Sequence, residues 1–525
     1  MKKFLNILFS ISLFAQFEEK ITVRLIEVPV VVTDRAGNII LNLKKDDFEL
    51  YVDKQLYPMT HFYEVKESVI ANKEFADFLE ERGIKIKEPV SIKRLFILID
   101  DQRILPSDFK RNLNSIINFI NTTLKENDEI AIYSISPSLI ELIPLTDDKE
   151  KTINFLSLYN TTGTLSSRWI LESKMLEENI VRQSYTPAFM QLRSFAEEKK
   201  WEIERTIEVL KAFFQNYFSL EGKKIALLLS EGYPTIPGIE FFYQLDKRFP
   251  QRAVLNETLN YDLSTNFQEL AYNALNSNFV VYSFDLRGLT LTSSFDAEYG
   301  TMDDVFGINL TDAQMASRSK QDSLKIISNT TGGKAILNQN DATKSLASIG
   351  LGLNNYYIIG FQTTSADNKK IHSIEVKVKN PEFVLSYFKN YKIFSEEYLF
   401  EQKINSAFYI EKELKNKLNI KANLGKSKKE GKYYNVPVQI IIPKSSLNFK
   451  GNKTSIRLGL SAFQERKKSD IFIQTLSLDE GEKEYYEIVR VLKMRKGKQF
   501  LIVALEEIGG ETSILKIEVE PAKLK

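Results

Sequence analysis

Two continuous apolar runs that end abruptly in acidic residues dominate the hydrophobic pattern of this chain. The run Lys93–Ile99 is followed by Asp100-Asp101, and the run 224–229 is followed by Ser230-Glu231-Gly232. Strand-like runs that alternate with helical patterns are typical of a parallel sheet with helices on both faces. Such sheets bind ligands beyond the carboxyl ends of their strands, where strand order reverses. The pattern therefore predicts a ligand or divalent-cation site at this edge.

Further elements of the same kind extend the predicted domain over residues 93–355. Apolar residues at helical spacing predict a helix from Phe109 to Leu124 and another around 267–275. The linker Ser136-Pro137-Ser138 is too short for a parallel crossover, so its two strands should form an antiparallel edge hairpin. Six strands are predicted, at 95–99, 129–135, 139–143, 225–229, 279–284 and 334–337.

Three insertions interrupt this pattern. Residues 165–205 have a helical pattern rich in charged residues, while 233–262 and 288–318 are loop-like and begin just past strand ends. Long insertions between the elements of a rigid sheet often determine binding specificity. Decoration without a ligand is the alternative interpretation for each of them.

The flanking regions are β-rich. We expect a β-hairpin segment at 16–66, a charged connector at 67–92, a second β segment at 356–394, a helical linker at 395–431 and an immunoglobulin- or fibronectin-like β-sandwich at 432–525. A sheet of a few short strands is stable only with further strands or with another element packed on one face. The segment 356–394 could therefore pair with the N-terminal hairpins. The predicted fold class is therefore α/β multidomain, with a Rossmann-like domain flanked by β-rich segments.

The first residues have the pattern of a secretory leader. Lys2-Lys3 precedes the apolar stretch Phe4–Phe14, and a polar run starts after Ala15. We therefore expect a signal peptide at 1–15 and an exported protein that is periplasmic, cell-surface or extracellular. Leu13 stands where a small residue is usual, so an uncleaved leader is the alternative and the one predicted route to the membrane.

Composition excludes several chemistries. The chain has no cysteine, which excludes thiolate metal sites and a Cys nucleophile, and with two histidines, His61 and His372, a multi-histidine centre is not expected. A net charge of +2 over 525 residues gives no electrostatic reason to expect nucleic acid as a partner. No P-loop or dinucleotide fingerprint is present, so no cofactor of those classes is predicted.

Four segments together resemble a known family. They are Val31–Asp34 with Gly37 and Asp46–Phe48, the strand into Asp100-Asp101, the stretch Leu229–Gly232, and Thr331–Gly333 followed by Tyr356–Phe361. The central domain resembles a von Willebrand factor A (VWFA) domain. Nearly the whole chain without its leader is similar to the secreted VWFA-related proteins described mainly from acidobacteria.

That resemblance implies a metal-ion-dependent adhesion site, usually Asp-x-Ser-x-Ser, a loop threonine and a later aspartate. Here Asp100 matches the first carboxylate, Gln102 and Ile104 replace the serines, Thr164 is the candidate threonine, and Glu231 replaces the later aspartate. Mg²⁺ requires six oxygen ligands in a near-octahedral array, and Ile104 provides none. The implied site, formed by Asp100, Gln102, Thr164 and Glu231 around Mg²⁺ or Ca²⁺, is therefore degraded.

Two interpretations of this edge stay open at this point. Its carboxylates either hold a weakened metal ion or organise the strand-end loops through hydrogen bonds. Asp101, Trp169 and Tyr233 are candidates for a partner-binding rim, because aromatic side chains are enriched at interface hot spots; loop packing is the alternative. Asp285 is expected to pair with Arg287 or to cap the loop, rather than to bind metal.

The functional prediction is an exported, non-enzymatic interaction or adhesion protein whose partner is a protein or a cell-surface polymer. A structural subunit of a cell-envelope assembly is the first alternative. A hydrolase that uses Asp100, Asp101 and Glu231 is the second, since paired carboxylates can hydrolyse glycosides.

Overall fold

The structure, a computed structural model, describes residues 24–67, 69–70, 92–289, 310–363, 370–410, 414–464 and 467–524. The predicted leader at 1–15 and most of the connector at 67–92 lie outside this range, as does 290–309 of the third insertion. None of the described helices is both long and apolar enough to cross a membrane.

A six-stranded sheet at the centre of the molecule confirms the predicted α/β class. Its order is β11-β10-β9-β6-β7-β8, with parallel pairing except between β7 and β8, the predicted edge hairpin. The strands are β6 (Lys93–Ile99), β7 (Glu129–Ser134), β8 (Ile140–Thr146), β9 (Lys223–Ser230), β10 (Phe279–Asp285) and β11 (Ala335–Ile336).

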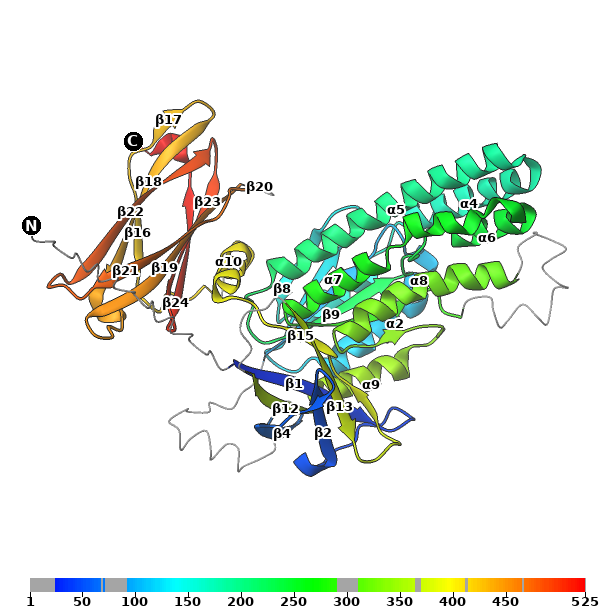
Figure 1. The fold of residues 1–525 in the computed structure, drawn as a ribbon, viewed down its shortest axis with the longest axis horizontal. Coiled ribbons are helices and arrows are strands. Elements are labelled where there is room, and N and C mark those ends of the chain that lie inside the picture. The colour runs from blue at the N-terminus through cyan, green and yellow to red at the C-terminus, as the bar shows by residue number, and fades with distance from the viewer. Residues whose placement is uncertain are drawn as a thin grey trace, which may run out of the picture.

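Helices cover both faces of this sheet, which is why Leu95–Ile99 of β6 and Ile225–Leu229 of β9 are apolar at every position. Leu95, Ile97 and Ile99 of β6 face one core, while Phe96 and Leu98 face the other. The first core contains residues of α2 (Pro106–Thr123), α3 (Lys149–Leu158) and α9 (Thr343–Asn354). The second contains residues of α4 (Thr164–Arg182), α5 (Tyr185–Asn216), α6 (Ile239–Arg248), α7 (Ser264–Asn276) and α8 (Leu310–Thr330). Figure 1 shows α4, α5 and α6 together at one end of the molecule.

The helical prediction for 165–205 agrees with α4 and α5, but the loop-like prediction for 233–262 was wrong. That stretch contains α6 and two 3-10 helices, η2 (Pro250–Arg252) and η3 (Val254–Tyr261). Phe241, Phe242 and Leu245 of α6 are buried in the core beside α5 and α8. The third insertion also becomes helical at Leu310, where α8 begins.

The N-terminal strands pair with the segment that follows the α/β domain. Strand β1 (Arg24–Thr33) pairs with β12 (Tyr356–Thr363), and β2 (Phe48–Val52) pairs with β13 (Ile371–Val378). The remaining elements are η1 (Lys45–Asp47), β3 (Gln55–Leu56), β4 (His61–Lys66), β5 (Val69–Ile70), β14 (Val384–Ser386) and β15 (Asn390–Lys392). The two resulting sheets share one core. The α/β domain is therefore inserted into a β unit.

A second β unit follows α10 (Glu396–Ala407). It begins earlier than predicted, because β16 (Lys421–Leu424) and β17 (Lys428–Glu430) already pair with β18. The helical linker is thus shorter than 395–431. Two antiparallel sheets enclose one core and contain β18 (Tyr433–Pro443), β19 (Lys453–Gln464), β20 (Lys467–Lys468), β21 (Phe472–Asp479), β22 (Tyr485–Arg495), β23 (Gln499–Glu507) and β24 (Thr512–Val519), with η6 (Lys444–Ser446) and η7 (Pro521–Lys523). Figure 1 shows this unit at the opposite end from α4 and α6.

Candidate functional site

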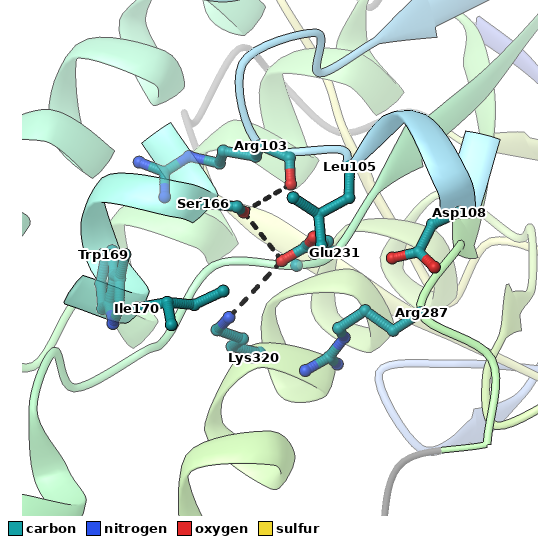
Figure 2. A pocket seen from close by; sticks show the side chains of 10 residues that line it. Arg103, Leu105, Asp108, Ser166, Trp169, Ile170, Glu231, Arg287 and Lys320 are labelled. Atoms are coloured by element: carbon teal, nitrogen blue, oxygen red, sulfur yellow. Dashed lines mark hydrogen bonds and ion pairs between the residues drawn. The ribbon is translucent and has the colours of Figure 1, made fainter. Parts of the chain in front are cut away.

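A cavity of about 220 Å³, lined by both charged and apolar side chains, lies at the carboxyl edge of the central sheet. The chain continues from β6 to β7 and β8 on one side and from β9 to β10 and β11 on the other, so strand order reverses between β6 and β9. The cavity opens beyond these two strand ends (Figure 2). Its lining comes from the loops after β6, β9 and β10 and from the helices α2, α4 and α8: Arg103, Leu105, Asp108, Ser166, Trp169, Ile170, Glu231, Gly232, Arg287 and Lys320.

Glu231 presents its carboxylate to this cavity, where Ser166 and Lys320 flank it (Figure 2). Its Oε2 is 3.0 Å from Ser166 Oγ and 3.7 Å from Lys320 Nζ. Burial raises the pKa of Glu231 and lowers the pKa of Lys320, because a poorly solvated site disfavours both charged forms. The attraction between the two groups opposes both shifts.

Gly232 brings Lys320 to this position. Its φ of +80° lies in the left-handed region, and a Cβ there would stand 2.4 Å from the carbonyl oxygen of Lys320. Only glycine combines that backbone conformation with so close an approach. The loop after β9 therefore packs directly on the backbone of α8.

Arg103 is held between two aromatic rings. Its guanidinium carbon lies 5.8 Å from the ring centre of Trp169 and 5.4 Å from that of Tyr233. Its Nε is 3.9 Å from Asp100 Oδ2, and its Nη2 is 4.0 Å from Glu202 Oε2. Among the described residues, these two nitrogens have no hydrogen-bond acceptor. A buried donor left without a partner costs about 1–3 kcal/mol, so the guanidinium of Arg103 is held in the packed interior beside the cavity and points away from it (Figure 2).

Arg287 is fixed by the predicted partner, Asp285. Its Nε and Nη2 donate to the two carboxylate oxygens of Asp285 over 2.9 and 2.7 Å. Asp285 is fully buried at the end of β10. Arg111 of α2 donates to the carbonyls of Leu286 and Arg287, at 2.6 and 2.8 Å. The bidentate pair therefore places a guanidinium group at the cavity wall.

Asp100, the predicted first metal ligand, is fully buried and does not line the cavity. Its Oδ1 accepts a hydrogen bond from Ser136 Oγ at 2.6 Å, and its Oδ2 accepts one from Ser230 Oγ at 3.0 Å. Its nearest cation is Arg103. The carboxylate thus links the ends of β6, β7 and β9.

The other predicted ligands do not converge on Asp100. Thr164 is exposed at the first position of α4, and neither it nor Gln102 lines the cavity. The backbone carbonyl of Gln102 accepts from the amide of Leu165 at 2.8 Å, so this residue positions the start of α4. Ile104 is fully buried in the apolar core below.

These residues do not fit a divalent ion. Such an ion needs several converging oxygen ligands, whereas Asp100 accepts hydrogen bonds from serine hydroxyl groups and the cavity wall carries the cationic side chains of Arg287 and Lys320. Within the described part of the chain, no group of three or more His, Cys, Asp or Glu side chains is arranged to hold a metal. The positive charge at this edge comes from the protein itself.

The predicted partner-binding rim is largely buried. Asp101 accepts hydrogen bonds from Tyr159 and Thr162, each at 2.8 Å, and so organises the loop before α4. The side chain of Tyr233 is packed beneath Arg103 and is 1% exposed. Both residues are therefore loop-packing groups. Trp169, 9% exposed, is the one member of the predicted rim that lines the cavity.

Arg103, Ser166 and Lys320 were missed by the sequence interpretation. Arg103 stands between the two positions examined as metal ligands, and Ser166 stands two residues after Thr164. Cationic side chains are not metal ligands, so a comparison with a metal site does not single out Arg103. Lys320 lies on α8, close to an insertion that was interpreted as a loop, and no local pattern connects it with Glu231.

Replacing Glu231 with glutamine is expected to raise the free energy of unfolding at pH 7 and to leave it unchanged at about pH 4. The folded-state pKa lies above the ordinary value of 4.5. The wild-type protein therefore binds this proton more tightly when folded, and it loses stability as pH rises through the folded-state pKa. Urea unfolding across this pH range measures the difference. The same substitution at exposed Glu150 is the control, and a destabilised Glu231→Gln at pH 7 would contradict the expectation.

Comparison with known proteins leaves the family open. No protein-family model and no curated protein matches this chain. Among solved structures, a serine-substituted aerotolerance-related membrane protein from Bacteroides fragilis matches at 12% identity and a TM-score of 0.25, and BatB from Bacteroides thetaiotaomicron matches at 12% and 0.21. Each match covers 50% of this chain and 98% of the other. Human COPII-coat protein Sec24c matches at 8% identity and a TM-score of 0.18, covering 82% of this chain and 44% of its own.

Proposed function

We propose that this chain is an exported, non-enzymatic interaction protein that binds its partner at the cavity between the ends of β6 and β9. The observation that carries the proposal is the position of this cavity, at the point where strand order reverses. Open α/β sheets bind ligands at such points. The inserted helix α4 forms one wall, and inserted elements commonly set specificity.

The central domain is proposed to be of the VWFA type. The acid-tipped strands with Asp100 and Glu231, and the mostly parallel sheet with one antiparallel edge, support this assignment. Its adhesion site is proposed to have lost the metal ion while keeping the binding position. Arg287 and Lys320 supply positive charge where the family site would hold a cation.

A non-enzymatic role is supported by the position of the acidic groups. Of the three carboxylates considered for a hydrolase, Asp100, Asp101 and Glu231, only Glu231 lines the cavity. Asp108, the other carboxylate there, pairs with Arg111 at 2.9 Å. Glycoside hydrolysis needs two carboxyl groups that face one bond, and the engaged state of Asp108 argues against that role.

Export is proposed from the leader pattern at 1–15. The proposed partner is then a protein or a polymer of the cell envelope. A structural subunit of an envelope assembly is the alternative, in which the sheet edge is scaffold only.

Capture of envelope components by the immobilised protein tests the proposal. Lys320→Gln is expected to reduce the captured partner by at least about tenfold, because it removes a cation from the cavity wall. Lys325→Gln, on the same helix but paired with Asp322 at 2.9 Å, is the matched control and should leave capture unchanged. Quantitative mass spectrometry of crosslinked material, with and without EDTA, provides the measurement, and circular dichroism verifies folding.

Equal capture by wild type and Lys320→Gln would contradict the proposal and favour the scaffold alternative. Turnover of a glycoside by the wild type, lost in Glu231→Gln, would establish the hydrolase instead. Loss of capture in EDTA would restore a metal-dependent site.

A further inference from the structure

We infer that β22 (Tyr485–Arg495) pairs with the same strand of a second copy of this chain, antiparallel and around a twofold axis at Arg490. Within the described residues, β22 pairs only with β18, so its other side is an open edge of the sheet. In the second sheet of this unit, the β24 edge is covered, because the amide of Ile514 donates to the carbonyl of Lys415 at 2.9 Å. The β22 edge is separate from the cavity at the central sheet, and the inference is independent of the proposed function.

The backbone of β22 directs hydrogen-bonding groups away from its sheet. The carbonyl of Pro437 in β18 accepts from the amide of Gly425 at 2.8 Å, on the side of β18 that faces away from β22. Backbone groups alternate between the two sides of a strand, so the bonds between β18 and β22 come from even-numbered residues, such as Val438 and Arg490. The odd-numbered residues of β22 therefore direct N–H and C=O outward. An edge of this kind is a template for another strand.

The same odd-numbered residues form the exposed face of β22. They are Tyr485, Glu487, Val489, Val491, Lys493 and Arg495. Val489 and Val491 are 52% and 61% exposed, and Tyr485 is 50% exposed. Charged residues on an edge strand usually prevent pairing with other chains. Here the order of the charges around the two valines determines which strand can cover them.

One register makes this face complementary to its own copy. A twofold axis at Arg490 places Val489 opposite Val491 of the second copy and Glu487 opposite Lys493 of the second copy, and each contact occurs twice. Tyr485 then lies opposite Arg495, whose guanidinium group can stack on the ring. Apolar pairs and opposite charges directly across an antiparallel ladder are stabilising. Moving the axis by two residues places Glu487 opposite Val489, or Lys493 opposite Val491, and the ion pair is lost.

Arg490 opposes this pairing and sets its strength. Its Nε and Nη2 donate to Gln474 Oε1 at 2.9 and 2.6 Å, and its Nη1 donates to the carbonyl of Val489 at 2.8 Å. That carbonyl is one of the outward groups, so Arg490 must release it when a second strand pairs. Arg490 also faces its own copy at the axis, and like charges directly opposite are destabilising. We therefore expect a reversible dimer rather than a permanent one.

Charge reversal tests the ion pair, with sedimentation velocity of the full-length protein over a series of concentrations. We expect a monomer–dimer equilibrium that Glu487→Lys and Lys493→Glu each weaken at least about fivefold, because each places like charges opposite each other twice. The double variant restores opposite charges and should recover the affinity to within about threefold. It also loses the contacts of Glu487 with Gln439 and of Lys493 with Glu430, so the recovery cannot come from the single chain. Lys421→Glu, exposed on β16 beyond β18, is the matched control and should change nothing.

Single cysteines test the register, because the chain has none of its own. The axis places position 490 opposite itself in a non-hydrogen-bonded pair, with Cα atoms about 4.5 Å apart, which is within the range of a disulfide. Arg490→Cys should therefore form a disulfide-linked dimer when diamide is added. Lys493→Cys should not, because its two copies are offset by about 20 Å along the strands.

A protein that stays monomeric at every concentration would overturn the inference, including one that binds a strand of a different protein at this edge. A dimer that neither single charge reversal weakens, or that the double variant does not recover, would overturn it as well. Crosslinking of Lys493→Cys in place of Arg490→Cys would contradict the register. Circular dichroism verifies the fold of each variant, and if a charge variant is unfolded, crosslinking of Arg490→Cys decides.

Discussion

Replacing Asp100 with alanine is expected to lower the free energy of unfolding of the α/β domain by about 3–5 kcal/mol. The carboxylate is fully buried, accepts hydrogen bonds from Ser136 and Ser230, and is the nearest anion to Arg103. Removing it leaves the buried guanidinium group of Arg103 with Glu202 as its remaining carboxylate, at 4.0 Å, and leaves two hydroxyl groups without their acceptor. Urea unfolding followed by tryptophan emission measures the change.

Exposed Asp147 supplies the control for this substitution, since its replacement by alanine should change stability by less than about 0.5 kcal/mol. The expected loss at Asp100 is the same with Mg²⁺ and with EDTA. A ligand that binds only the folded state stabilises it. If Mg²⁺ stabilises the wild type but not Asp100→Ala, then Asp100 is a metal ligand and the structural role assigned to it is wrong.

Replacing Phe213 with alanine is expected to cost about 3–5 kcal/mol as well. Phe213 of α5 is fully buried and its ring centre lies within 5.3–5.6 Å of five other aromatic rings. They belong to Phe96, Tyr133, Phe214, Tyr217 and Phe279. The substitution would leave a cavity where α5 packs on β6, β7 and β10, and the neighbouring rings could fill it only in part.

Trp201→Ala on the same helix is the control for Phe213→Ala. Trp201 is 57% exposed, so its loss should change the unfolding free energy far less. A cost below about 1 kcal/mol for Phe213→Ala would mean that the inserted helix α5 does not share the core of the sheet.

The sequence pattern predicted the central sheet because burial of both faces leaves a strong signal. Strands β6 and β9 contain continuous apolar runs, Leu95–Ile99 and Ile225–Leu229, and the short Ser136-Pro137-Ser138 linker allows only an antiparallel hairpin. The stretch 233–262 was misread because proline and glycine at Pro234, Pro237 and Gly238 favour a loop. They precede α6, whose apolar residues bury it against its neighbours.

The location of the candidate site was predicted from the sequence, but its chemical character was not. Glu231 lies at the cavity, as expected for a residue that follows a central strand. Asp100, at the equivalent end of β6, instead accepts hydrogen bonds from the hydroxyl groups of Ser136 and Ser230. Sequence alone could not decide between these outcomes, because both depend on neighbours from other strands. Lys320 reaches Glu231 only through the packing of α8 on the loop at Gly232.

Calorimetric titration of the wild-type protein with Mg²⁺, Mn²⁺ and Ca²⁺ tests the central claim, that protein cations have replaced a metal ion at this edge. The account predicts no saturable heat of binding at the cavity for any of the three ions. One-site binding that disappears in both Asp100→Asn and Glu231→Gln, with folding intact, would contradict it and restore the metal-dependent adhesion site.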